Sequence, residues 1–188
     1  RNTCTHMQSL GQSIVQGFEY NDKSYVLKRY NPGPFLTLLR RSLFPSRARK
    51  SWSNACILNL AFIPTAQPVA FLEIGNFPRS MAYLLLERID GELLSEYVAR
   101  FRGDDLLMES LVEKVGRIWD SLARLRAVHG DLKATNWIVS TKGEVHLFDL
   151  DSLSIGLSNR AYLPGRQRDM RRFLKNWASD SQLAEAFR

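Results

Sequence analysis

A short polar loop, together with the hairpin and the aspartate that follow it, constrains the fold of this chain more than any other feature. The loop spans residues 129–136 and reads His-Gly-Asp-Leu-Lys-Ala-Thr-Asn. It follows residues 105–125, in which apolar residues recur every three or four positions, as on the buried face of a helix. Residues 137–140 and 145–148 have the composition of strands and flank a Thr-Lys-Gly-Glu turn. The predicted hairpin would return the chain from the loop to Asp149.

The part of the chain before residue 87 is predicted to form a small β-sheet with one helix. Residues 13–30 contain two runs rich in Val, Tyr and Phe around Asn21-Asp22, a pattern typical of a β-hairpin. Apolar residues at helical spacing predict a helix over residues 47–60. Residues 69–74 and 81–86 are predicted to be two further strands.

The strand pattern stops at residues 87–91, where we place a hinge between two lobes. Residues 92–100 and 105–125 have helical spacing, and residues 160–188 are predicted to form one or two basic helices. The predicted fold class is therefore α+β, with two lobes. The predicted domains are 1–86 for a small lobe of β-sheet and one helix, 87–91 for the hinge, and 92–188 for a compact, mostly helical lobe that carries the polar loop.

The positive charge is distributed unevenly along the chain. Eight basic and no acidic residues lie between Lys23 and Leu72, whereas the rest of the chain carries 18 basic and 19 acidic residues. Such a field attracts nucleic acid, anionic lipid head groups or phosphorylated glycans. Residues 35–44 combine apolar clusters with arginines, which predicts peripheral contact with an anionic membrane; a packed helix or loop with solvated arginines is the alternative.

Three observations favour a cytoplasmic location. Cys4 and Cys56 are too few cysteines for a disulfide framework. Residues 1–10 lack the apolar segment of a secretory signal. No run of about 18 uninterrupted apolar residues occurs, so we expect no membrane-spanning helix.

Residues 129–136 and Asp149 together resemble the catalytic loop and the metal-binding aspartate of protein-kinase-like phosphotransferases, which read H-x-D-x-K-x-x-N and then D-x-x. The resemblance implies a two-lobed kinase fold that uses ATP and Mg²⁺. It implies that Asp131 accepts or orients the proton of the attacking hydroxyl, and that Lys133 neutralises charge on the transferred phosphoryl group. It also implies that Asn136 and Asp149 supply oxygen ligands to Mg²⁺.

The same resemblance implies a nucleotide site in the small lobe and the hinge. Lys28 would bind the α- and β-phosphates, and the backbones of Glu87 and Ile89 would bind adenine. Gly11 is the glycine that could begin a phosphate-covering loop. We expect His129 to hold the loop through hydrogen bonds rather than to act in catalysis.

The sequence departs from the kinase pattern at three places. The helix glutamate that usually pairs with the strand lysine is missing, and Ser51 stands nearest to its position. The G-x-G-x-x-G of the phosphate-covering loop is also missing, which leaves open either that nucleotide clamping is weak or that the first strand of the sheet is absent. Asp151 replaces the glycine of D-F-G and adds a carboxylate that could be a further metal ligand.

Only 39 residues follow Asp149 in this sequence, and they contain no A-P-E sequence, so we expect no segment like the one that binds peptide substrates in protein kinases, and no regulated Ser/Thr or Tyr protein kinase. Residues 47–52, residues 63–65 with Pro68, and residues 166–174 resemble the lipopolysaccharide core kinases. That family phosphorylates heptose or Kdo sugars of the inner core at the cytoplasmic face of the membrane. The resemblance implies lipopolysaccharide core, or another phosphorylated glycan, as the partner.

Three other functions stay open at this stage. The chain could be a kinase of another small acceptor, although its basic bias disfavours an aminoglycoside. It could be a catalytically silent kinase-like binding module, given the missing glutamate and glycine loop. Nucleic-acid binding is the weakest alternative, because only Phe44 and Trp52 are interleaved with the basic residues, and we expect no nucleic-acid partner. The sequence does not indicate the oligomeric state.

Overall fold

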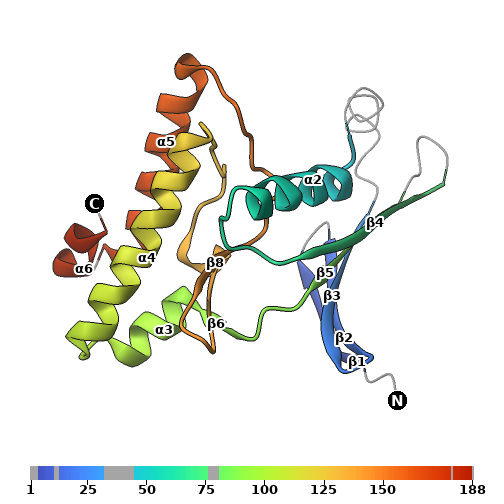
Figure 1. Ribbon diagram of the computed structural model, residues 1–188, viewed down its shortest axis with the longest axis horizontal. Coiled ribbons are helices and arrows are strands. Elements are labelled where there is room, and N and C mark those ends of the chain that lie inside the picture. Colours follow the sequence, from blue (N-terminus) through green and yellow to red (C-terminus); the bar gives the residue numbers. More distant parts are fainter. Residues whose placement is uncertain (1–3, 11–12, 32–44, 76–80, 179, 188) are drawn as a thin grey trace. The chain divides into compact units, whose positions relative to one another are not determined.

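The computed structural model describes residues 4–10, 13–31, 45–75, 81–178 and 180–187 (Figure 1). The chain divides into two compact units, which are described separately. The first unit comprises residues 1–57 with 66–88, and the second comprises residues 58–65 with 89–188.

Where the structure describes the first unit, its strands form an antiparallel five-stranded sheet in the order β1-β2-β3-β5-β4. The predicted hairpin of β2 and β3 is confirmed, and Asn21 and Asp22 at its turn have positive φ angles of 49° and 59°, which these residue types tolerate. The elements are β1 (Cys4–Leu10), β2 (Ser13–Tyr20), β3 (Lys23–Tyr30), α2 (Arg47–Leu60), β4 (Pro68–Ile74) and β5 (Met81–Glu87).

The suggestion that the first strand of the sheet is absent is wrong, because β1 pairs with β2 from Cys4 to Leu10, with one shift of register between Cys4 and His6. The sequence of β1 lacks the alternation of apolar and polar residues that marks a strand. Its backbone pairing, rather than its own pattern, therefore defines it. Residues 11 and 12, which include Gly11, lie outside the described residues.

The core of the first unit joins α2 to the sheet. Ala48 is fully buried on α2 and clusters with Tyr30 of β3 and Leu84 of β5. Trp52 and Phe71 pack against this cluster, and their ring centroids are 5.2 Å apart. The apolar positions at helical spacing thus anchor the predicted helix on the sheet.

The described residues of the second unit form a small antiparallel sheet, in the order β6-β7-β8, and four α-helices. The helix predicted over 92–100 begins later than expected, at Leu94, because residues 91–93 pair with β7 instead. The elements are β6 (Gly91–Leu93), α3 (Leu94–Phe101), α4 (Asp105–Arg124), β7 (Trp137–Ser140), β8 (Val145–Leu147), α5 (Asn159–Leu174) and α6 (Ser181–Ala186).

Phe173 of α5 lies at the centre of an aromatic cluster in this unit. Its ring contacts Trp119 of α4 and Trp137 of β7, with centroid distances of 6.2 and 5.6 Å, and also Trp177 and Phe187. Phe173 and Trp137 are both fully buried. Burying one such side chain contributes about 1.5–3 kcal/mol. The cluster therefore fixes α5 alongside α4, as Figure 1 shows.

In the described part of the chain, no helix is both long and apolar enough to cross a membrane. Residues 35–44, for which membrane contact is predicted, lie outside the described residues.

Candidate active site

The polar loop lies between α4 and β7 of the second unit, and the β7–β8 hairpin returns the chain to Asp149. The Phe148 amide donates a hydrogen bond to the Asn136 carbonyl at 3.1 Å, which ties the residue before Asp149 to the end of the loop. Asp149 has a positive φ of 59°, a conformation that aspartate reaches more readily than most residues. The hairpin thus brings Asp149 back to the loop, as predicted.

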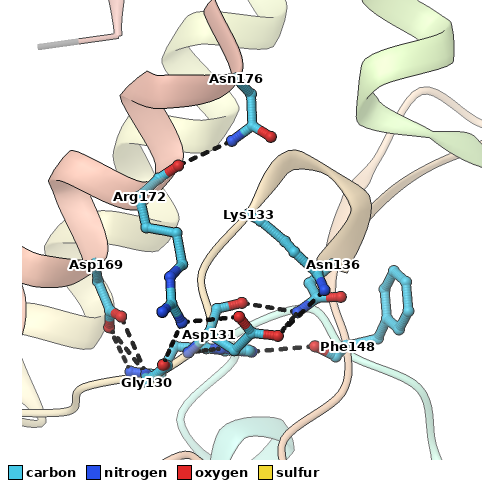
Figure 2. Close-up of polar contacts among 9 residues, drawn as sticks. Gly130, Asp131, Lys133, Asn136, Phe148, Asp169, Arg172 and Asn176 are labelled. Atoms are coloured by element: carbon cyan, nitrogen blue, oxygen red, sulfur yellow. Dashed lines mark hydrogen bonds and ion pairs between the residues drawn. The ribbon is translucent and has the colours of Figure 1, made fainter. Parts of the chain in front are cut away.

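Asp131 is paired with two cations (Figure 2). Lys133 Nζ lies 3.3 Å from Asp131 Oδ2, and Arg172 Nη1 lies 2.8 Å from Asp131 Oδ1. The side chain of Asp131 is 36% exposed, and those of Lys133 and Arg172 are 46% and 50% exposed. The carboxylate is therefore accessible to solvent while two positive charges flank it.

Asn136 is almost completely buried, and its amide group faces Asp131. Its Nδ2 donates a hydrogen bond to the Asp131 carbonyl at 2.7 Å and lies 3.4 Å from Asp131 Oδ2. The opposite amide orientation would place oxygen against oxygen, so the nitrogen faces the loop and Oδ1 points away from it. An amide oxygen from Asn136 and a carboxylate from Asp149 are hard donors that fit Mg²⁺.

His129 is completely buried and connects the two ends of the site. Its Nε2 lies 3.1 Å from the Phe148 carbonyl, and its Nδ1 lies 3.4 Å from the Asp131 amide nitrogen. Burial lowers the pKa of His129, although the hydrogen bond to Phe148 and the nearby carboxylates act in the opposite direction. A neutral ring with the proton on Nε2 satisfies both contacts, in agreement with the structural role expected for His129.

The lowered pKa of His129 leads us to expect that the protein loses stability as the pH falls below 6.5, the ordinary histidine pKa. In this range the unfolded chain takes up a proton that the folded chain resists, and one such group contributes at most about 1.4 kcal/mol per pH unit. Denaturant titrations between pH 7.5 and 5.5 should show a shallower pH dependence for His129→Gln than for the wild type.

His146 provides the comparison, because burial also lowers the pKa of this histidine, which lies outside the loop. His146→Gln should remove its own, separate part of the pH dependence. An unchanged pH dependence in His129→Gln would contradict the neutral, buried state of that ring.

Asp169 of α5, to which the sequence analysis assigned no role, holds the backbone of the loop. Its Oδ2 accepts a hydrogen bond from the His129 amide at 2.7 Å, and both of its oxygens lie within 3.2 Å of the Gly130 amide. Only 3% of Asp169 is exposed. Gly130 has a positive φ of 83°, and a Cβ there would lie 3.1 Å from Ser152 Cβ. A glycine is therefore needed for both amides to face one carboxylate.

Gly165, Asp169 and Arg172 share one face of α5, because they are four and three residues apart. A Cβ at Gly165 would lie 2.6 Å from Val128 Cγ2, so glycine permits α5 to approach the residue just before the loop. One turn later Asp169 reaches the loop amides, and Arg172 Nη1 donates to the Gly130 carbonyl at 2.7 Å. One feature of the sequence could have identified Asp169 as a candidate, because it is the sole acidic residue between Asp151 and Asp180.

A cleft of about 410 Å³ lies on another part of α5. It is lined by Arg166, Gln167, Met170 and Arg171. At 3.6 residues per turn these side chains lie on the opposite side of the helix from Asp169 and Arg172. The cleft is therefore not part of the site around Asp131.

The predicted phosphate-binding residue, Lys28, belongs to the first unit. It lies on β3 between Val15 and Leu84, and its Nζ lies 5.2 Å from the centroid of the Tyr30 ring. Arg47 approaches the same ring at 5.2 Å. Both cations are within the range of cation–π attraction, so one buried ring orients them.

The other predicted residues are distributed over both units. Glu87 ends β5, its amide donates to the Gln67 carbonyl, and its carboxylate pairs with Lys23, which raises the pKa of Lys23. Ile89 begins the second part of the other unit. Ser51, at the place of the missing glutamate, is buried, as is Asp151. The residues that the structure brings together are Asp131, Lys133 and Asn136, with Asp149 joined to them through Phe148.

Comparisons with known proteins agree with this geometry. The model of the lipopolysaccharide kinase (Kdo/WaaP) family matches residues 6–186. A search of the curated proteins finds no match. Among many matching solved structures, the crystal structure of WbdD superposes with a TM-score of 0.55 and 20% sequence identity over 82% of this chain. The chain spans only 34% of WbdD, and the similarity concerns the fold alone. The expected two-lobed, protein-kinase-like α+β fold is confirmed.

Proposed function

Because the chain belongs to the lipopolysaccharide kinase (Kdo/WaaP) family, whose members are phosphotransferases with a hydroxyl acceptor, we propose that it transfers a phosphoryl group from ATP to a sugar hydroxyl of the lipopolysaccharide inner core. One observation carries the proposal beyond family membership. Asp131, Lys133 and Asn136 converge on one loop, and Asp149 follows a residue that is hydrogen-bonded to that loop. These are the residue types that phosphoryl transfer requires.

Asp131 receives the proton of the acceptor hydroxyl in this proposal. Its exposed carboxylate is held by Arg172 at one oxygen, and the other oxygen faces Lys133. A loop carboxylate with this exposure can hydrogen-bond to an incoming hydroxyl and orient its attack. Lys133, which is more exposed than Asp131, neutralises negative charge on the transferred group.

Asn136 and Asp149 would hold Mg²⁺ through their side-chain oxygens, and the ion would offset the negative charge of the phosphate oxygens. In the first unit, Lys28 binds the α- and β-phosphates, and the backbones of Glu87 and Ile89 bind adenine at the hinge. Gly11 begins the phosphate-covering loop. We infer that the enzyme acts at the cytoplasmic face of the inner membrane; the basic residues between Lys23 and Leu72, which favour contact with anionic lipid or glycan, support this location.

The proposal is tested first with the wild-type protein. ATP consumption should require both lipopolysaccharide core oligosaccharide and Mg²⁺ or Mn²⁺, and it should stop when EDTA removes the metal. Mass spectrometry of the product should show one added phosphate. Metal-dependent nucleotide binding without any phosphorylated product, across core preparations of different length, would contradict the proposed activity.

Asp149→Ala should weaken nucleotide binding by about tenfold or more when Mg²⁺ is present, because a carboxylate ligand of the ion is lost. Without the metal, the Kd for ATP should match that of the wild type. Calorimetric titrations with and without Mg²⁺ measure both values. Asp120→Ala is the matched control. Asp120 is an exposed residue of α4, so its substitution should leave the Kd for ATP unchanged with and without Mg²⁺. If Mg²⁺ changes the Kd for ATP equally in Asp149→Ala and Asp120→Ala, Asp149 is not a ligand of the ion.

A catalytically silent binding module is the second candidate. The observation that favours it is Ser51, which is buried where a kinase usually has the glutamate that pairs with its lysine. Against it, the Tyr30 ring lies close enough to orient Lys28 without that glutamate. The silent module predicts nucleotide binding with no turnover, so the product assay separates the two candidates.

A further inference from the structure

Arg172 touches the proposed catalytic carboxylate, and the reaction described above uses only the one nitrogen that holds this carboxylate. Its Nη1 donates to Asp131 Oδ1 at 2.8 Å and to the Gly130 carbonyl at 2.7 Å (Figure 2). Within the described ranges of the chain, its Nε and Nη2 make no hydrogen bond, and half of the side chain is exposed. One nitrogen of the guanidinium therefore binds the loop, and its other donors remain available to a ligand.

Orientation of the loop does not by itself require this arginine. Asp169 already holds the backbone of His129 and Gly130, and the other oxygen of Asp131 faces Lys133. Holding an exposed arginine in one geometry also opposes its side-chain entropy. Lys133 and Arg172 exceed Asp131 by one positive charge, and the nearby Asp169 carboxylate is buried against the amides of His129 and Gly130. The charges that face solvent here therefore favour an additional anion.

The position of Arg172 indicates which bound molecule carries this anion. An acceptor hydroxyl that donates to Asp131 must lie about 2.6–3.2 Å from its carboxylate. The substituents next to that hydroxyl then come within reach of a guanidinium that is itself 2.8 Å from the same carboxylate. Arginine binds carboxylates and phosphates through paired hydrogen bonds better than any other side chain does. We propose that Arg172 binds an anionic group, a carboxylate or a phosphate, that the acceptor carries next to the hydroxyl to be phosphorylated.

The surface of α5 is consistent with an anionic ligand. The helix contains five arginines and one acid, Asp169, whose carboxylate is buried against the loop. A cation near a helix C-terminus is also favoured by the helix dipole, which is a simpler reason for arginines in the last turn. Arg171 also lies in the last turn, but on the other side of the helix. Arg171→Gln is therefore the matched control for Arg172→Gln.

The inference rests on the proposed function, and its test uses a binding measurement that does not need turnover. The acceptors are intact core oligosaccharide, the same material with its carboxylates converted to amides, and dephosphorylated core. Arg172→Gln should weaken binding of intact core, measured by calorimetry without ATP, by roughly tenfold or more. The treatment that removes the recognised anion should weaken wild-type binding to the same degree and have no effect on Arg172→Gln, which identifies the anion as carboxylate or phosphate.

Two further variants complete the test. Arg172→Lys should bind intact core with intermediate affinity, because it keeps the charge but loses the paired hydrogen bonds. Arg171→Gln should bind like the wild type. If Arg172→Gln keeps the wild-type affinity and the wild-type discrimination among the three acceptors, and only its kcat falls, the residue merely positions Asp131 and the proposal is wrong. If binding depends on Arg172 but the wild type forms no product, the anion site stands and the proposed kinase activity fails.

Discussion

Asp131→Asn should lower kcat for phosphoryl transfer by about 10²–10⁴-fold, the range expected when a general base is lost. The substitution conserves shape, and the amide oxygen can still accept the hydrogen bond from Arg172. Because Asp131 is partly exposed, its ion pairs contribute at most about 1 kcal/mol each to folding. Single-turnover transfer from labelled ATP to core oligosaccharide measures the loss, and nucleotide titration should give a Kd within about twofold of wild type.

Asp120→Asn is the control for this experiment, because it makes the same chemical change at an exposed position on α4. It should leave both kcat and the Kd for ATP unchanged. Should Asp131→Asn retain kcat within about threefold of the wild type, the proton of the acceptor leaves by another route and the role of Asp131 is wrong.

The elements that the sequence predicted best are those whose signal is local. The helices α2 and α4 carry their apolar residues at helical spacing, and both were predicted to within one residue of their observed ends. The loop at residues 129–136 was likewise recognisable from its own sequence, because its polar side chains are close together in the chain. By contrast, β1 and β6 are strands because of distant partners, β2 and β7 respectively. A pairing of this kind leaves little trace in the short segment itself.

The difference between local patterns and distant contacts also explains which site residues the sequence predicted. Asp131, Lys133 and Asn136 lie within six residues of one another, so a single pattern identified them together. Asp169 and Arg172 lie about forty residues further along and reach the loop only because α5 packs against it. That packing depends on a missing side chain at Gly165 and on the aromatic cluster of Phe173, neither of which periodicity reveals. The nucleotide contacts of Lys28, Glu87, Ile89 and Gly11 stay predictions.

Asp169→Ala should reduce the free energy of unfolding by about 2–4 kcal/mol, because two backbone amides in a buried part of the loop lose their acceptor. For a chain of this size, this corresponds to a fall in Tm of roughly 5–15 °C. At temperatures well below that Tm, kcat should also fall, since His129 and Gly130 immediately precede the carboxylate of Asp131. Calorimetric melting and transfer assays at 15 °C measure the two effects separately.

Asp104→Ala is the matched comparison for Asp169→Ala. The Asp104 carboxylate accepts a backbone hydrogen bond from Leu107 at 3.0 Å, but it caps α4 at an exposed position. Its loss should reduce the free energy of unfolding by only about 1 kcal/mol and leave kcat unchanged. Asp169→Asn should fall between the two, because its amide oxygen can still accept one bond while its NH₂ group opposes the other. Equal destabilisation by Asp169→Ala and Asp104→Ala, with kcat preserved in both, would mean that the loop keeps its shape without α5.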